Sequence, residues 1–108
     1  MSENKIDTKF LITSMDKTFS DCLETAKRKN ADYAGEVTDP FKNFKNSLVV
    51  GVPVERGILV RIMDKVSRIS NLIDKDAQVK DETITDTLDD AINYLAILKA
   101  YIQSTKQQ

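Results

Sequence analysis

The stretch from Asp81 to Ile102 constrains the fold most, because its apolar residues recur at spacings of three and four over its whole length. These apolar positions are Ile84, Leu88, Ala91, Ile92, Leu95, Leu98 and Ile102. A helix with such a stripe has to bury it against other apolar surface. Asp81 suits the N-cap position, and the acidic first turn suits the positive end of the helix dipole. The stretch therefore predicts a long, packed helix.

The other side of this predicted helix carries acidic and amide side chains at spacings of three and four. They are Glu82, Asp86, Asp89 or Asp90, and Asn93. Like charges at such spacing cost roughly a few tenths of a kcal/mol per pair unless cations intervene. Tyr94, Ile97 and Tyr101 lie off the core stripe, so the C-terminal half of the helix is apolar nearly all round and enclosed. We expect the acidic row to face protein, metal or ligand; a solvated acidic face is the alternative.

Composition limits the classes of protein and of chemistry. The 108 residues predict one domain, and 41% hydrophobic with 31% charged residues predict a globular chain. A net charge of -1 argues against a partner that is a nucleic-acid polymer. No apolar run has the length of a membrane span and no signal peptide opens the chain, so we expect a cytoplasmic protein without a membrane partner. One cysteine and no histidine exclude a disulfide framework and histidine catalysis.

Two further helices flank a less regular segment. Apolar spacing predicts a first helix from about Asp7 to Lys29, after a flexible end at residues 1–6. Val52-Pro53 opens another helix, whose core stripe is Ile58, Ile62, Val66, Ile69 and Ile73. The predicted fold is an all-α bundle of three long helices and one short helix, with one domain at residues 7–102 and a polar tail at 103–108.

Residues 30–52 hold the short helix, predicted from Pro40 to about Ser47 with Asp39 as its N-cap. Long connections in small domains are often functional. The side chains that could stack on and hydrogen-bond to a base or sugar are Asn30, Asp32, Tyr33, Phe41, Asn43 and Phe44. The alternative is that the aromatic residues only plug the end of the bundle.

Charged and amide side chains from the last two helices are expected to face each other. The second long helix contributes Arg61, Asp64, Lys65, Arg68 and Asn71. In one reading, Asp64, Glu82, Asp86 and Asp89 act in catalysis, with Glu82, Asp86 and Asp89 as ligands of Mg2+, which bridges phosphates and activates water. In the other, the charges pair with one another and leave arginine and lysine to hold phosphates without catalysis.

Four motifs in order carry a resemblance to a known family. They are Lys29-Asn30-Ala31-Asp32-Tyr33, Asp39-Pro40-Phe41-Lys42-Asn43-Phe44, the run from Arg61 to Leu72, and the run from Asp81 to Tyr94. Together, over roughly residues 26 to 102, they resemble the first of the nucleotide-modification-associated domain families, small domains common in phages and mobile elements. The resemblance implies a nucleotide-related role in the cytoplasm of a bacterial host, and gives a class rather than a reaction.

The chain is more distantly similar to the MazG-like all-α nucleoside triphosphate pyrophosphatases. Their last metal-binding helix has an acidic pair three apart followed by an apolar run, which Asp86 and Asp89 match. Their preceding helix has two glutamates three apart. This chain departs from that pattern, because Asp64 is followed three places later by Ser67; Glu82 or Asp90 is the candidate replacement.

Three functions stay open from the sequence. The first is binding and Mg2+-dependent cleavage of a small phosphorylated nucleotide, at a site that includes Asn71 and Asn93. The second is sequestration, without cleavage, of a linear or cyclic nucleotide signal of host antiviral defence. The third is a structural role for an ion-pair network. We also expect a homo-oligomer, with Tyr94, Ile97 and Tyr101 near its interface and pockets shared between subunits.

Overall fold

The computed structural model describes residues 6–34, 39–75 and 83–106. Its elements in chain order are helix α1 (Thr8–Ala34), the 3-10 helix η1 (Lys42–Val50), helix α2 (Val54–Lys75) and helix α3 (Ile84–Lys106). No strand occurs in these three ranges. The predicted all-α fold of three long helices and one short helix is confirmed.

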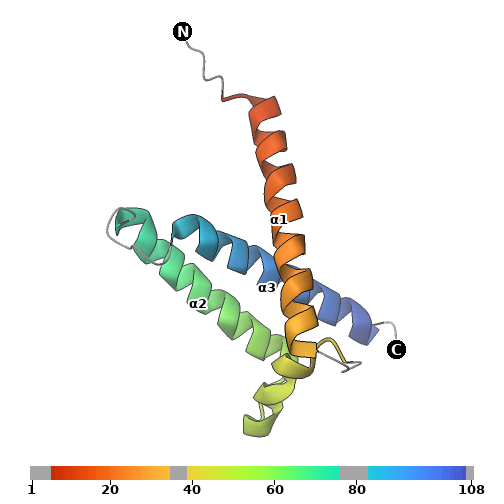
Figure 1. Cartoon of the computed structure of the whole chain (residues 1–108). Helices are drawn as coiled ribbons and strands as arrows, with labels where there is room; N and C mark the ends of the chain where they lie inside the picture. Colours follow the sequence, from red (N-terminus) through yellow and green to blue (C-terminus); the bar gives the residue numbers. More distant parts are fainter. Residues whose placement is uncertain (1–5, 35–38, 76–82, 107–108) are drawn as a thin grey trace.

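Helices α2 and α3 run antiparallel and form the central layer, and α1 crosses α3 on one side of it (Figure 1). The core between the two central helices is built on Val54, Ile58 and Ile62, which are almost fully buried. Its partly buried neighbours come from η1 and α3, namely Phe44, Tyr94, Ile97, Leu98 and Tyr101. The aromatic residues of this group therefore pack against the chain's own core, and the subunit interface predicted near the tyrosines stays a prediction.

The apolar stripe predicted for α3 is only partly buried within the chain. Ala91 is buried, but Leu88, Leu95 and Ile102 keep 41%, 53% and 37% of their surface exposed. The prediction that the whole stripe is buried is therefore wrong within the single chain: α3 is apolar nearly all round, and Leu98 of the stripe packs against the core together with Tyr94, Ile97 and Tyr101. Helix α2 shows the same shift: Val66 is exposed, although the sequence placed it in the core stripe.

Helix α1 is anchored at its C-terminal half. Cys22 is buried there, and its Sγ lies 3.7 Å from the carbonyl oxygen of Asp89 on α3. The N-terminal half projects beyond the α2–α3 layer (Figure 1) and exposes more than half of the surface of Phe10, Ile12 and Phe19. The predicted apolar stripe of α1 thus packs inside the chain along only part of its length.

Side-chain caps fix where the helices begin. The Asp7 carboxylate accepts a hydrogen bond from the Phe10 amide at 3.0 Å, and the Thr83 hydroxyl accepts one from the Asp86 amide at 3.1 Å. Thr83 therefore caps α3, whereas the predicted cap, Asp81, lies outside the described residues. Helix α1 runs five residues past the predicted end at Lys29, and α3 continues into the polar residues up to Lys106.

The short helix η1 is held against α2 by a close approach at Gly57. A Cβ atom added at Gly57 would lie 2.8 Å from Cβ of Ser47, so only glycine lets η1 come this near. The Ser47 hydroxyl donates a hydrogen bond to the carbonyl of Val52 at 2.8 Å, and Gly51 ends η1 with a φ of 77°.

In the described part of the chain, no helix combines the length and apolarity needed to cross a bilayer.

Candidate functional site

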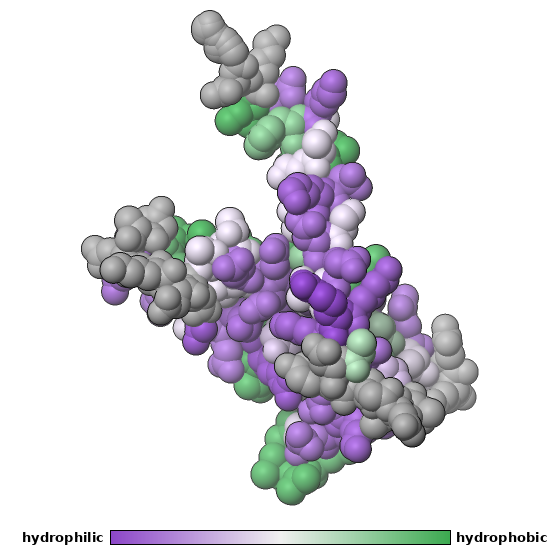
Figure 2. Space-filling model, in the orientation of Figure 1, coloured by the Kyte–Doolittle hydropathy of each residue, from purple (hydrophilic) through white to green (hydrophobic). Residues whose placement is uncertain are grey.

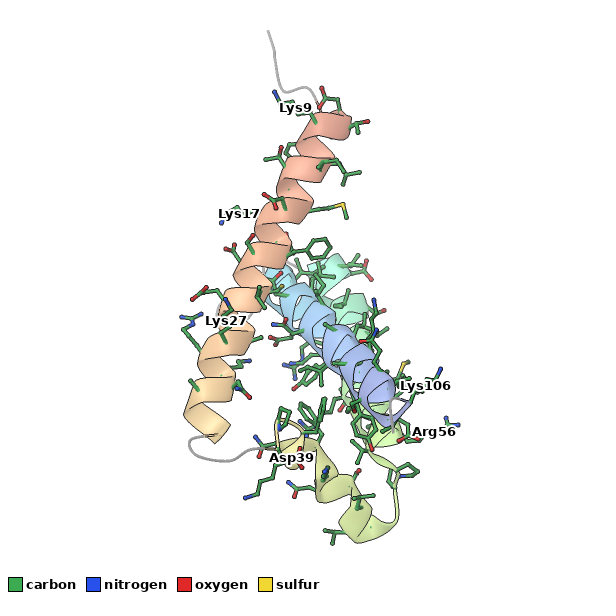
Figure 3. All side chains as sticks on the ribbon, turned by 90° about the vertical axis from the view of Figure 1, so that its right-hand side faces the viewer. Lys9, Lys17, Lys27, Asp39, Arg56 and Lys106 are labelled. Atoms are coloured by element: carbon green, nitrogen blue, oxygen red, sulfur yellow. The ribbon has the colours of Figure 1, made fainter. Side chains whose placement is uncertain are left out.

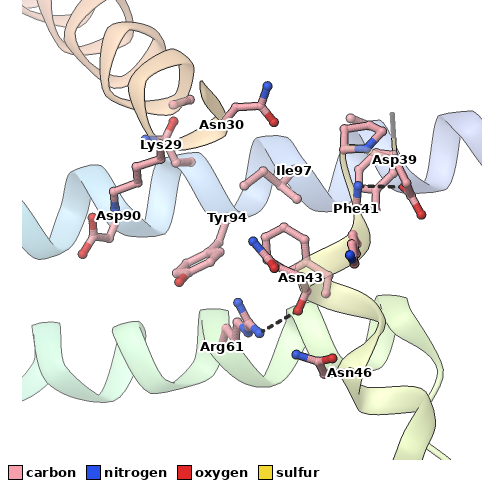
Figure 4. A pocket seen from close by; sticks show the side chains of 16 residues that line it. Lys29, Asn30, Asp39, Phe41, Asn43, Asn46, Arg61, Asp90, Tyr94 and Ile97 are labelled. Carbon is pink, nitrogen blue, oxygen red and sulfur yellow. Dashed lines mark hydrogen bonds between the residues drawn. The ribbon is translucent and has the colours of Figure 1, made fainter. Parts of the chain in front are cut away.

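An open pocket of about 640 Å³ lies where the C-terminal half of α1, η1 and the central layer meet (Figure 4). Its lining combines apolar, amide and charged side chains from all four helices and the turn before η1. The polar lining residues are Lys29, Asn30, Asp39, Lys42, Asn43, Asn46, Arg61, Asp90, Asn93 and Tyr94. A volume of this size lies in the range of small-molecule sites.

The turn into η1 is fixed by Asp39. One oxygen of its carboxylate accepts a hydrogen bond from the Phe41 amide at 2.9 Å, and the other lies 2.6 Å from Nζ of Lys45. The hydrogen bond from Lys45, and then that from the Phe41 amide, lower the pKa of Asp39 below its usual range. This arrangement carries Phe41, Asn43 and Phe44 to the rim of the pocket, although η1 begins at Lys42 with Phe41 at the N-cap position and not at Pro40 after Asp39, as predicted.

Aromatic contacts seat η1 on α3. The ring of Phe41 meets that of Tyr101 edge to face with centroids 5.3 Å apart, and Phe44 meets Tyr94 in the same way at 6.4 Å. Such pairs add about 0.5–1.5 kcal/mol each beyond their buried area. The aromatic residues thus do plug the end of the bundle, and Phe41, Phe44 and Tyr94 line the pocket as well.

Arg61 is the central basic residue of the site. Its guanidinium lies 4.8 Å from the centroid of the Phe44 ring and donates a hydrogen bond to the carbonyl of Asn43 at 3.4 Å. Figure 4 shows Arg61 on α2 and Tyr94 on α3 pointing into the same space. These contacts hold the guanidinium in place, so less conformational entropy is lost when it binds an anion.

A second, smaller hollow of about 200 Å³ adjoins the pocket through Arg61 and Tyr94, which line both. Its other lining residues are Asp64, Lys65 and Arg68. The two hollows together expose five basic side chains, because Lys29 and Lys42 belong to the larger one, against three aspartates. The region is therefore locally basic in a chain whose net charge is -1.

The acidic side chains of the larger pocket are both paired. Asp39 pairs with Lys45, and Oδ2 of Asp90 lies 3.1 Å from Nζ of Lys65. The second pair confirms the expectation that a basic residue of α2 faces the acidic row of α3. Of the other carboxylates expected in this constellation, Asp64 and Asp86 are exposed, and Asp89 meets α1 through its carbonyl oxygen.

The predicted Mg2+ site needs a residue that the structure does not describe. Glu82 lies outside the described residues, which leaves Asp86 and Asp89 of the predicted ligand set. Among the residues that are described, no three acidic or cysteine side chains come together to hold a metal ion. Mg2+ is commonly held by one or two carboxylates together with water and substrate phosphates, so the predicted site stays a prediction, and we derive no step through the metal.

Most of the predicted ligand-binding residues that are described do come together. The larger pocket holds Asn30, Phe41, Asn43, Phe44, Arg61 and Asn93, and the adjoining hollow holds Lys65 and Arg68. Asn71 is exposed and lines neither. The backbone of Asp32 and Tyr33 lies in α1, but their side chains are outside the described part.

Six polar residues of the pocket were not predicted as ligand-binding residues, namely Lys29, Asp39, Lys42, Asn46, Asp90 and Tyr94; Asp39 was predicted as an N-cap and Asp90 as a candidate metal ligand. Lys29 and Lys42 belong to the first two of the four motifs that carry the family resemblance. Lys45-Asn46 repeats the pair Lys42-Asn43. That repeated pair was the available signal. Nothing in the spacing of Tyr94 indicated the pocket, because its position depends on the aromatic contact with η1.

Comparison of the chain with known proteins found no match. No protein-family model matches the chain, and no curated protein and no solved structure matches it.

Proposed function

We propose that the chain binds a small phosphorylated nucleotide in the pocket between α1, η1 and the central layer, and holds it without cleaving it. The observation that carries the proposal is the position of Arg61, whose guanidinium joins the aromatic and amide part of the site to its basic part. A nucleotide has the matching two parts, a planar base with a polar edge and an anionic phosphate.

The aromatic and amide part suits a base and a sugar. Phe41, Phe44 and Tyr94 provide apolar ring surface, against which a base can lie. Four asparagines, at positions 30, 43, 46 and 93, both donate and accept hydrogen bonds through one side chain. Such groups can pair with ring nitrogens, exocyclic groups and hydroxyls without any additional charge.

The basic part suits phosphate. Arg61 presents a planar fork that matches phosphate oxygens, and Lys29 and Lys42 form no ion pair with any residue that the structure describes. Lys65 reaches the adjoining hollow but is paired with Asp90. An incoming phosphate therefore meets two lysines and an arginine within reach of the larger pocket.

The carboxylates of the larger pocket favour binding without cleavage. The two aspartates of the larger pocket are each paired with a lysine, and none of the predicted catalytic residues Asp64, Asp86 and Asp89 lines this pocket. This agrees with the departure from the MazG-like pattern at Ser67. Sequestration, the second function left open by the sequence, is therefore the function we propose.

The experiment is to incubate the protein with a panel of linear and cyclic nucleotides and Mg2+, remove the protein by filtration, and denature it to release what it holds. Mass spectrometry then compares both fractions. We expect one class of nucleotide to be depleted from solution and recovered intact after denaturation. Release of a monophosphate and pyrophosphate would overturn binding without cleavage, and no depletion of any nucleotide would overturn the proposal as a whole.

A further inference from the structure

The side of the α2–α3 layer opposite α1 is apolar and uncovered within the chain. In a view along the side of the layer, α1 lies along one side and no described helix lies along the other (Figure 3). Helical spacing places on this second side several of the large apolar residues of α2 and α3 that the chain's own core leaves exposed. We call this surface the back face: Leu59, Met63, Val66 and Ile73 of α2 with Leu88, Leu95 and Ile102 of α3.

The back face is apolar near its middle and almost free of charge. Val66 and Leu95 expose 45% and 53% of their surface, although each lies on a helix beside the main core. Between Leu59 and Ile73 this side of α2 carries no charged residue; on α3, Lys99 lies near its edge. The side that carries α1 is different, since polar residues cover most of it (Figure 2).

The accessible surface area of the chain is larger than that of a typical folded monomer of the same mass. Its accessible area is 8541 Å², whereas a folded monomer of 12.2 kDa exposes about 6,100 Å² by the usual scaling with mass. The excess is about 2,400 Å², and the projecting half of α1 contributes to it as well as the back face. Obligate homodimers bury about 1,000–2,500 Å² per subunit, so the exposed surface leaves room for an interface of that size.

We propose that the back face is covered by the back face of a second copy of this chain. A two-fold axis through the face brings apolar residues against apolar residues from both copies, and the resulting four-helix layer buries the stripe of Leu88, Leu95 and Ile102. The uncharged centre favours self-association over a different partner, because it offers no charge pattern to select one. Each pocket then faces outward and is built from one chain, unlike the shared pockets expected from the sequence.

The test is sedimentation equilibrium of the full chain and of two matched variants. Leu95→Glu puts a charge into the back face, whereas Val49→Glu puts the same charge on η1, where Val49 is 86% exposed. We expect the wild type and Val49→Glu to be dimers, or multiples of dimers, at micromolar concentration. Leu95→Glu should raise the dissociation constant by about 30-fold or more, as for a central interface residue.

A wild-type monomer at micromolar concentration would overturn the proposal, as would a folded Leu95→Glu variant that assembles like the wild type. Thiol labelling of Leu95→Cys decides the case if Leu95→Glu loses its helical circular dichroism. Burial of Cys22 raises the pKa of its thiol, so the native cysteine should stay silent. Leu95→Cys should then label far more slowly than Val49→Cys; equal rates would overturn the proposal.

Discussion

The two sides of the α2–α3 layer are built from the same pair of helices but differ in polarity. On the α1 side, Arg61 and Lys65 of α2 face Asp90, Asn93 and Tyr94 of α3 across hollows that remain open. On the back face the same helices present aliphatic residues and almost no charge. A polar concave side and an apolar side without a covering element call for different partners, a small charged ligand and a protein surface.

The comparison teaches that an amphipathic helix in this chain has more than two sides. Helix α3 turns one side to α2, a second to α1 and the pocket, and a third to the back face. A spacing rule that looks for one apolar stripe and one polar stripe cannot describe such a helix. The predictions below separate the two sides, and begin with a residue on which both depend.

Ile58→Ala should have the largest effect, because Ile58 of α2 is fully buried in the core and supports both sides of the layer. We expect the free energy of unfolding to fall by about 2–5 kcal/mol, the usual cost of removing such a side chain from a core. Chemical denaturation at matched protein concentration measures it. The control Val49→Ala, at an exposed position, should change the value by less than about 0.5 kcal/mol.

Arg61→Ala should weaken nucleotide binding by about 10- to 100-fold, because a hydrogen bond to a charged group contributes about 1.5–3 kcal/mol. Isothermal titration calorimetry with the nucleotide from the panel measures the dissociation constant. Arg56→Ala is the matched control, since Arg56 is an exposed arginine of the same helix that lines neither hollow. Equal effects of the two variants would show that only bulk charge matters.

The helices and their approximate order were within reach of the sequence, but the sides they turn to one another were not. Spacings of three and four found α1, α2 and α3, and Asp39-Pro40 marked the turn before η1, which begins two residues later than predicted, at Lys42. The contacts of the tyrosines could not be predicted, because their partners Phe41 and Phe44 are about 50 to 60 residues away in the chain. The predicted motifs nevertheless supplied most of the pocket, because each holds polar residues with no role in a core.

Gly57→Ala should have a smaller effect, confined to the pocket side. The added methyl group would meet Cβ of Ser47 at 2.8 Å and push η1, with Asn43 and Phe44, away from α2. Overpacking of this kind costs about 1–3 kcal/mol, against about 1 kcal/mol gained in helix propensity. We expect a several-fold weaker nucleotide affinity and an unchanged oligomeric state.

The double variant Ser47→Gly with Gly57→Ala is the control for that clash, because it removes the atoms that the new methyl group meets. It should bind nucleotide more tightly than Gly57→Ala alone. If Gly57→Ala instead stabilises the chain and binds normally, the close approach of η1 to α2 does not shape the pocket.

The pH dependence of η1 should be the smallest effect. The pKa of Asp39 is lowered in the folded chain by Lys45 and by the Phe41 amide, so its stabilising contribution is present above the unfolded pKa of about 4. That contribution is lost as the pH falls through the lowered folded value. Asp39→Asn should therefore be less stable than the wild type at neutral pH, and the difference should shrink on acidification; a constant difference would contradict the account.

The most direct test of the two-sided account is a titration of the 15N-labelled chain with the bound nucleotide, followed by 1H–15N correlation spectra. We expect the amide signals of Asn43, Phe44, Arg61, Asn93 and Tyr94 to shift, while those of Val66, Ile73 and Leu95 on the back face stay in place. Shifts centred on the back face, or no shifts with any nucleotide of the panel, would contradict the assignment of the pocket side to a nucleotide.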